Sequence, residues 1–185
     1  MQYQIRRATL ADAATLQSLI SRSARELSTS DYKPEVVEGA LRGAFGVDTQ
    51  LIMDGTYFVV ESDGTLVACG GWSYRRTLFG SDAGDQRDAA ELDPALDAAK
   101  IRAFFVDPTH ARKGIGTLLL NRCESEAQMR GFSRVELMAT LPGVKLYAAR
   151  GYVPTGRVVH PVGIDLAIEF VPMRKEIAAA PPISS

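Results

Sequence analysis

The sequence IRAFFVDPTHARKGIGTLLLNRCESEAQMRG, residues 101–131, contains an apolar run, a basic turn with two glycines and a helical pattern, in that order. The apolar run is rich in aromatic and β-branched residues, which is typical of a strand, and it ends at Asp107 and Pro108. Gly114 and Gly116 lack a Cβ atom, so backbone N–H groups at the start of the helix can approach a ligand closely. Because the helix dipole favours negative charge there, the stretch predicts an anion-binding site.

The composition is that of an ordinary globular protein. The 185 residues suit one domain, and 46% are hydrophobic and 23% charged. The 21 basic and 22 acidic residues leave a net charge of -1, which indicates neither a nucleic-acid nor a membrane partner.

Cys69 and Cys123 have no CxxC spacing and no histidine at zinc-ligand distance, so we expect buried, reduced thiols and no metal site. The N-terminus lacks a signal-peptide pattern, and no apolar run approaches the roughly 20 residues that span a bilayer. We therefore expect a cytoplasmic protein.

The remaining chain alternates strand and helix patterns around the central stretch. Thr9 and Asp12 are typical of a capping pair at a helix start, and the Asp-Gly pair at 63–64 predicts a hairpin turn. We expect strands over 3–8, 57–61, 66–74, 101–106, 133–138, 152–160 and 165–174, and helices from about 10 to 27, 34 to 41, 115 to 130 and 143 to 150.

This order predicts one α/β domain over residues 1–175, with a mixed twisted sheet of about seven strands flanked by about four helices. The segment 75–100 is acidic, rich in alanine and poor in periodic apolar residues, so we expect a surface insertion between strands. Residues 176–185 form a C-terminal tail without a core-forming pattern.

Two common phosphate-binding motifs do not fit the glycine turn. A dinucleotide fingerprint requires a third glycine where this chain has Leu119. A P-loop requires Gly-Lys followed by Ser or Thr, whereas Lys113 precedes the first glycine and Thr117 follows the second directly. Tight packing of the helix on its strand is the structural alternative for the two glycines.

Two separate segments carry a family resemblance. The stretch VDPTHARKGIGTLLLNRCESEAQMRGF, residues 106–132, resembles the core motif of the GCN5-related N-acetyltransferases, and ELMATLPGVKLYAARGYVP, residues 136–154, is similar to their later strand and short helix. With the element order on both sides, the resemblance covers about residues 3 to 175. It implies the acyl-CoA N-acyltransferase fold and acetyl-CoA as co-substrate.

The resemblance also implies which residues hold acetyl-CoA. The pyrophosphate would bind the turn, and the pantetheine arm would enter where two parallel strands separate, with a backbone N–H near Phe105 and Val106 meeting the oxyanion. The family's usual Arg or Gln falls at Ala111, so Arg112 and Lys113 carry the charge instead. The expected cofactor-binding residues are Phe104, Phe105, Val106, Arg112, Lys113, Gly114, Ile115, Gly116 and Thr117.

Acetyl transfer to an amine needs a neutral nucleophile, a stabilised oxyanion and a proton for the departing thiolate. Tyr147 matches the family's general-acid tyrosine. The strand before the turn offers only Arg102 as an ionisable side chain, so Glu136 is our candidate for the general base, with Asp107 and His160 as alternatives.

The acceptor pocket has weaker sequence signals. Trp72 and Tyr74 precede the insertion and are our candidates for its lining, and the adjacent Arg75 and Arg76 favour an anionic group on the substrate. A core role for Trp72 is the alternative.

The sequence thus predicts an N-acetyltransferase that moves an acetyl group from acetyl-CoA to a primary amine of a small molecule or peptide. Transfer would be direct, in a ternary complex. A non-catalytic acyl-CoA-binding or sensing domain is the alternative, and a nucleotide-binding domain is a third hypothesis. The acceptor, the base and a homodimer formed through the insertion stay open.

Overall fold

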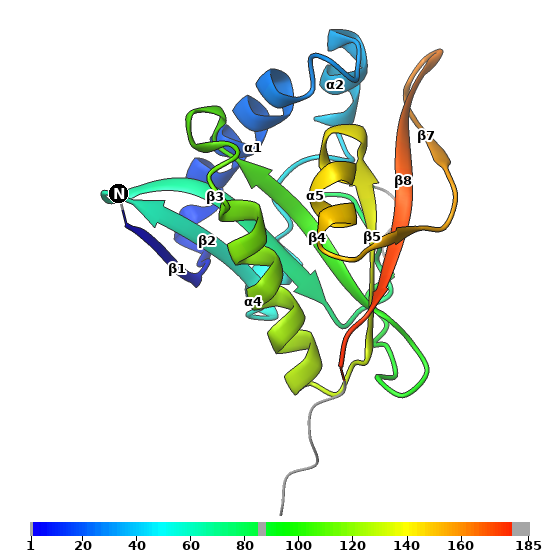
Figure 1. The fold of residues 1–185 in the computed structure, drawn as a ribbon. Helices are drawn as coiled ribbons and strands as arrows, with labels where there is room; N and C mark the ends of the chain where they lie inside the picture. Colours follow the sequence, from blue (N-terminus) through cyan, green and yellow to red (C-terminus); the bar gives the residue numbers. More distant parts are fainter. Residues whose placement is uncertain (1, 85–87, 179–185) are drawn as a thin grey trace, which may run out of the picture.

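The structure is a computed structural model that describes residues 2–84 and 88–178. Over those residues the chain forms a mixed α/β domain with one eight-stranded sheet and five α-helices (Figure 1), which confirms the predicted fold class. The strands are β1 (Tyr3–Arg7), β2 (Tyr57–Ser62), β3 (Thr65–Ser73), β4 (Ala99–Val106), β5 (Arg134–Thr140), β6 (Val153–Pro154), β7 (Val158–Gly163) and β8 (Leu166–Glu176). The α-helices are α1 (Ala13–Leu27), α2 (Pro34–Ala40), α3 (Thr49–Met53), α4 (Ile115–Met129) and α5 (Val144–Ala149), with 3₁₀ turns at Leu10–Asp12, Pro108–His110 and Leu141–Gly143.

The sheet runs in the order β1-β2-β3-β4-β5-β8-β6, and β7 also pairs with β8. Within the described residues, β4 and β5 are the one parallel pair, and α4 connects them. The strand–turn–helix stretch is therefore the crossover unit that the sequence predicted.

The predicted strand over 152–160 is two strands, β6 and β7, which lie along β8. The interruption falls opposite Pro172 of β8, whose carbonyl accepts the Thr155 N–H at 2.8 Å. A proline has no N–H to return, so the ladder breaks at this point.

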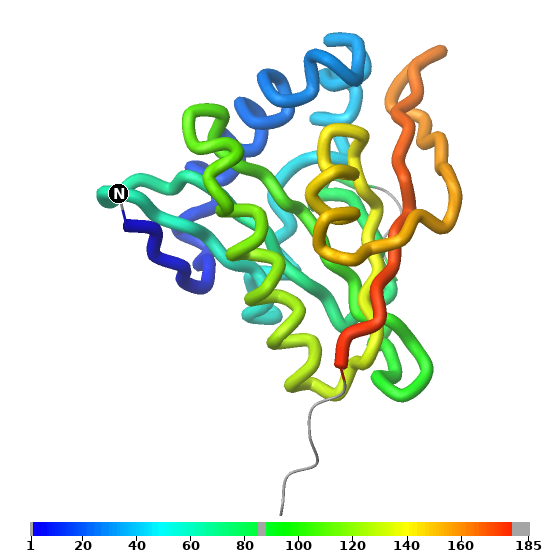
Figure 2. The backbone as a smooth tube through the Cα atoms, in the orientation of Figure 1, coloured from blue at the N-terminus to red at the C-terminus, as the bar shows by residue number. Residues whose placement is uncertain are grey.

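The parallel pair β4 and β5 separates after three residues. Pairing ends at Ile101 and Leu137, after which β5 continues against β8, and the two strands diverge visibly in Figure 2. The register between β3 and β4 shifts at the same place, where Ala103 has a left-handed φ of 56° and its carbonyl accepts the Tyr57 hydroxyl at 3.2 Å. A bulge bends its strand and increases the local twist, so this bulge directs the second half of β4 away from β5.

Helices cover both faces of the sheet. On one face α4 and α5 pack over a core that includes Ile101, Leu119 and Phe132, and on the other α1 and α2 pack over Leu16, Tyr57 and Phe170 (Figure 1). The sequence of β2 is continuously apolar because both of its faces are buried: Phe58 and Val60 face the first core, and Tyr57 and Val59 face the second.

The predicted insertion at 75–100 differs from expectation in extent and in packing. Ala99 and Lys100 belong to β4, so the loop spans 74–98. Its first part is fixed to the domain: Ser81 donates two hydrogen bonds to the Gly43 carbonyl, from N at 2.9 Å and from Oγ at 2.8 Å, and Arg75 pairs with Asp54. This segment is a wall of the domain, although its composition suggested a surface loop.

Helix α3 and the C-terminal tail differ from the sequence prediction. Helix α3 was not predicted; Asp48 caps it by accepting the Gln50 N–H at 3.1 Å. The predicted tail begins at Glu176, which ends β8, and its last seven residues, 179–185, lie outside the described residues. In the part of the chain that the structure describes, no helix combines the length and apolar character needed to cross a membrane.

Candidate active site

A cavity of about 520 Å³ opens where β4 and β5 separate. Its walls come from the C-terminal half of α1, the end of β4, the turn before α4 and the segment 140–147. We call it the inner cavity, and its lining residues are Ser23, Ala24, Leu27, Ser28, Phe45, Phe104, Phe105, Val106, His110, Ala111, Arg112, Gly114, Ile115, Gly116, Thr117, Thr140, Pro142, Gly143, Lys145, Leu146 and Tyr147. The bulge at Ala103 thus creates the space that the resemblance implied.

The two glycines of the turn have different roles. Gly114 is the N-cap of α4 with φ of +83°, a conformation that favours glycine, and a Cβ built on it would meet nothing within 4 Å. Gly116 has ordinary helical geometry, but a Cβ there would lie 2.8 Å from Cδ2 of Leu146. Gly114 therefore opens the turn, and Gly116 allows α4 to pack closely on helix α5, whereas the structural alternative from the sequence was packing of the helix on its strand.

The start of α4 presents unpaired backbone donors to the inner cavity. The first four N–H groups of any α-helix have no partner within the helix, and Ile115, Gly116 and Thr117 all line the cavity. Free N–H groups and the helix dipole at a helix start are the features that favour phosphate oxygens.

The two basic residues before Gly114 diverge. Arg112 lines the inner cavity and has a left-handed φ of 61°. Lys113 is absent from the described lining, and its Nζ donates to the Thr109 carbonyl at 2.9 Å. Arg112 is therefore the basic residue that lines the cavity. The Lys113 ammonium instead stabilises the turn, so the structure gives no side-chain contact that would support the expected binding of cofactor by Lys113.

The end of β4 forms the apolar wall of the inner cavity through Phe104, Phe105 and Val106. The Val106 N–H donates to the Ser23 hydroxyl of α1 at 3.2 Å. Ser23 thus occupies an N–H that the sequence assigned to the oxyanion, and Ser23 itself lines the cavity. Sequence reasoning missed this residue, although a signal was present: Ser23 is a polar residue on the buried face of α1, three residues after Ile20 and four before Leu27.

Tyr147 stands at the junction of the cavity and the separated strands. It is 8% exposed, its ring lies 6.3 Å from that of Phe104, and its hydroxyl makes no hydrogen bond with another described residue. Burial raises the pKa of the Tyr147 phenol well above its ordinary value, and the Cys123 thiol adds to the effect. The hydroxyl is therefore protonated at neutral pH and free to donate.

Tyr152 has a structural environment. Its hydroxyl donates to Oε1 of Glu124 at 2.9 Å, and its ring packs in the core under α4. This agrees with the expectation that Tyr152 is a core residue.

Two of the three candidates for the general base are engaged elsewhere. Glu136 pairs with Lys100 and is absent from the described residues that line the inner cavity. The structure therefore does not place this candidate for the general base in the site. Burial alone would raise the pKa of the Asp107 carboxyl, but hydrogen bonds from Thr109 and the charge of Arg22 lower it below its usual range. Both carboxylates are ion-paired, Glu136 with Lys100 inside the paired part of β4 and β5 and Asp107 with Arg22 just after β4.

The predicted acceptor residues Trp72 and Tyr74 do not line the inner cavity. Trp72 is 3% exposed and packs edge-on against Phe132 in the core under α4. The ring of Tyr74 is covered by the Arg130 guanidinium at 3.6 Å. The core alternative for Trp72 is therefore the one that the structure supports, because β3 turns this side chain to the face that α4 covers.

Two further hollows continue from the inner cavity. A narrow one of about 70 Å³, which we call the passage, shares Phe45, Phe104, Phe105, Thr140 and Tyr147 with the inner cavity. The passage in turn shares Ala44, Leu78, Phe79 and Gly80 with an outer cavity of about 540 Å³. The outer cavity is lined by Gly39, Arg42, Gly43, Ala44, Arg76, Thr77, Leu78, Phe79, Gly80, Ala83, Gly84, Asp88, His160, Pro161 and Val162.

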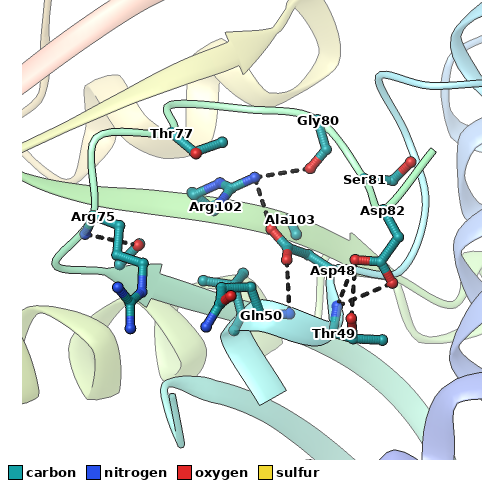
Figure 3. A network of polar contacts seen from close by, with 12 residues as sticks. Asp48, Thr49, Gln50, Arg75, Thr77, Gly80, Ser81, Asp82, Arg102 and Ala103 are labelled. Atoms are coloured by element: carbon teal, nitrogen blue, oxygen red, sulfur yellow. Dashed lines mark hydrogen bonds and ion pairs between the residues drawn. The ribbon is translucent and has the colours of Figure 1, made fainter. Parts of the chain in front are cut away.

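The wall between the passage and the outer cavity is fixed by a buried ion pair (Figure 3). The Arg102 guanidinium lies 2.8 Å from Oδ2 of Asp48 and donates to the Gly80 carbonyl at 2.8 Å. The two side chains are 3% and 0% exposed. Arg102 therefore connects the 74–98 loop and the start of α3 to β4. It lies one residue beyond Ile101, the last residue of β4 that pairs with β5.

Comparison with known proteins agrees with this geometry. A family model described as the acetyltransferase (GNAT) family matches residues 22–152, while a search of curated proteins gave no match. A GCN5-related N-acetyltransferase from Rhodopseudomonas palustris superposes with a TM-score of 0.72 at 18% identity, covering 96% of this chain and 97% of that one.

Two further structures contain cofactor. The PaiA N-acetyltransferase from Thermoplasma acidophilum, in complex with coenzyme A, gives a TM-score of 0.64 at 15% identity over 95% of this chain and 99% of that one. YncA from Salmonella typhimurium, an acetyltransferase by its description, solved with acetyl-CoA, gives 0.63 at 16% identity over 100% of both chains. The family match covers more than half of the sequence and confirms the resemblance of its two motifs, so the chain belongs to the GNAT family of acetyltransferases.

Proposed function

We propose that this acetyltransferase moves an acetyl group from acetyl-CoA to a primary amine of a small molecule or peptide, by direct transfer in a ternary complex. One observation carries the proposal: the free N–H groups of α4, the apolar end of β4 and the unpartnered Tyr147 hydroxyl all face one cavity. The pyrophosphate of acetyl-CoA binds at Gly114–Thr117, and its pantetheine arm lies along Phe104–Val106. Coenzyme A in the PaiA structure and acetyl-CoA in the YncA structure support this choice of co-substrate.

The transfer requires one bond to form and one to break. The neutral amine attacks the thioester carbon, the oxyanion collapses, and the C–S bond breaks to release a thiolate. Tyr147 gives its proton to that thiolate and is reprotonated from solvent. A thiol has a pKa near 8.5 and a phenol one near 10, and burial raises the pKa of Tyr147 further, so the proton moves to the thiolate only because the buried thiolate is also desolvated and is then a stronger base than in water.

Ser23 is suited to meet the oxyanion. Its hydroxyl oxygen accepts the Val106 N–H, so its own hydrogen is available for donation toward the cavity. A donor that is already oriented costs no reorganisation when charge develops.

His160 is the base candidate with the best position. It lines the outer cavity and its ring packs against Phe79 at 5.0 Å, whereas the two carboxylate candidates are ion-paired. Because the passage separates His160 from Tyr147, the proton leaves the amine through water.

The test measures thiol release from acetyl-CoA with a panel of amines, for wild type and Tyr147→Phe. Loss of the proton donor should lower turnover by about 100-fold or more, while acetyl-CoA affinity stays within a few-fold. Tyr152→Phe is the matched control, since it removes a hydroxyl outside the cavity, and its turnover should be close to that of wild type.

The outcomes separate the hypotheses. An unchanged rate in Tyr147→Phe would show that another group protonates the thiolate. Acetyl-CoA binding without turnover for any amine would favour the non-catalytic acyl-CoA-binding function, which the ion-paired Glu136 and Asp107 make the specific competitor.

A further inference from the structure

The outer cavity contains two arginines, Arg42 and Arg76, that have no ion-pair partner among the residues that the structure describes. Of the described residues that line it, Arg42, Arg76, Asp88 and His160 are the ionisable ones. Among the described residues the Arg42 guanidinium makes one hydrogen bond, a long one of 3.3 Å to the Val162 carbonyl. Neither Arg42 nor Arg76 forms an ion pair with any residue of the described chain.

Neighbouring charges compensate Arg42 and Arg76 only in part. Arg75, adjacent in sequence, forms a bidentate pair with Asp54 at 2.7 and 2.8 Å, so it is already satisfied. The Glu38 carboxylate near Arg42 is bound by Arg25. Asp88 is the one carboxylate among the described lining residues, and it accepts the Ala90 N–H at 3.0 Å. The two guanidinium groups therefore outnumber the carboxylate there and leave a positive charge for a ligand.

The lining of the outer cavity also includes an aromatic side chain that is held in place by its neighbours. Phe79 packs against His160 at 5.0 Å and Phe170 at 5.3 Å, and its loop is fixed by the Arg102 contact with Gly80 (Figure 3). The volume of about 540 Å³ is in the usual range for a small-molecule site. The cavity adjoins the passage through Phe79 and Gly80, and the passage reaches Tyr147.

We infer that the outer cavity binds the acceptor, and that the acceptor is a small amine that also carries an oxyanion group bound by Arg42 and Arg76. Guanidinium groups bind carboxylate and phosphate oxygens in pairs, so either anion satisfies the chemistry. With its anion at the arginines, the ligand extends along Phe79 and directs its amine through the passage toward the thioester. This inference rests on the proposed function, because it identifies the acceptor of that same site.

The experiment compares amines that differ by the anion alone. The pairs are β-alanine with propylamine for a carboxylate, and phosphoethanolamine with ethanolamine for a phosphate. With wild-type protein, kcat/KM from thiol release should favour at least one anionic member by about tenfold or more, and the preferred pair identifies the anion. Equal rates within both pairs, or a preference for the neutral members, would overturn the inference.

Substitutions test whether Arg42 and Arg76 cause the preference for anionic amines. Arg42→Gln and Arg76→Gln should each remove most of the preference by raising KM for the anionic amine, with KM for acetyl-CoA unchanged. Arg112→Gln is the reciprocal control, since it lies at the inner cavity and should raise KM for acetyl-CoA while the acceptor preference stays. A preference that survives both outer substitutions would also overturn the inference.

A binding measurement keeps the inference separate from the proposed function. Calorimetry with coenzyme A-loaded protein and the same four amines does not depend on turnover. If no amine is acetylated but an anionic amine binds, and Arg76→Gln abolishes that binding, the proposed function fails and the anion site stands. If no anionic amine binds or reacts, the anion site is wrong whatever the protein does with acetyl-CoA.

Discussion

The inner and outer cavities are built in different ways. The inner cavity owes its anion site to one local unit, the turn from Arg112 to Thr117, whose geometry follows from a glycine and a helix start. The outer cavity is assembled from α2, the 74–98 loop and β7, segments that are far apart in sequence, and Arg102 of β4 holds the loop near the passage through the Gly80 carbonyl. A local unit can be predicted from its residues, whereas an assembled one depends on contacts between segments.

Gly114→Val should have the largest effect and is confined to the inner cavity. A β-branched residue at φ +83° is strained, and its side chain would fill the open space beside the turn. We expect acetyl-CoA affinity to fall by about 100-fold or more, since two or more hydrogen bonds to charged oxygens are lost. Calorimetry measures the affinity, and circular dichroism checks the fold.

Gly64→Val is the matched control for this variant. Gly64 has φ of +76° and open space beside it, but it lies in the turn between β2 and β3. Both variants carry similar backbone strain, so equal loss of affinity in the two would mean that instability, and not the anion site, explains the result.

Arg102→Met should destabilise the protein beside the outer cavity. It leaves the Asp48 carboxylate buried beside an apolar side chain, and breaking such a pair costs about 3–5 kcal/mol of unfolding free energy. Urea denaturation measures this cost. The double variant Arg102→Met with Asp48→Leu removes both charges and should recover much of the stability; a double variant as unstable as the single one would mean that the ion pair is not the cause.

Tyr32 connects β8 to the 3₁₀ turn beside the inner cavity and gives a dependence of stability on pH. Its hydroxyl donates to the Glu169 carbonyl at 2.7 Å and accepts the Leu141 N–H at 2.8 Å, next to the inner cavity. Burial raises the pKa of Tyr32 to about 12, against the weaker opposing effect of the Leu141 N–H. The unfolded chain therefore loses the tyrosine proton first, near pH 10, and the stabilisation is lost as pH rises from about 10 to 12.

Urea midpoints between pH 8 and pH 11.5 measure this effect. Tyr32→Phe should lower the free energy of unfolding at pH 8 by about 1–3 kcal/mol, because two buried backbone groups lose their partner. It should also make the alkaline decline shallower than in wild type. An identical slope in both proteins would assign the decline to other buried tyrosines.

Gly116→Ala should have the smallest effect. The added Cβ meets only the end of the Leu146 side chain, which can change rotamer. Since alanine also favours a helix over glycine by about 1 kcal/mol, the two effects nearly offset and stability should change by less than about 1 kcal/mol. If Gly116→Ala lowered acetyl-CoA affinity as much as Gly114→Val, both glycines would be needed for the ligand to approach the backbone closely.

The sequence by itself determined the parallel crossover at 101–131, the hairpin of β2 and β3 and the anion-binding turn of the inner cavity, because these depend on local periodicity and on residues within one turn; the family followed from the resemblance of two motifs. Eight of the nine expected cofactor-binding residues line that cavity. The tertiary structure decided the rest. Which face of β3 carries Trp72, which carboxylate is paired with Lys100, and how Arg76 comes to share a cavity with Arg42 all depend on contacts between distant segments, and no local pattern encodes those contacts.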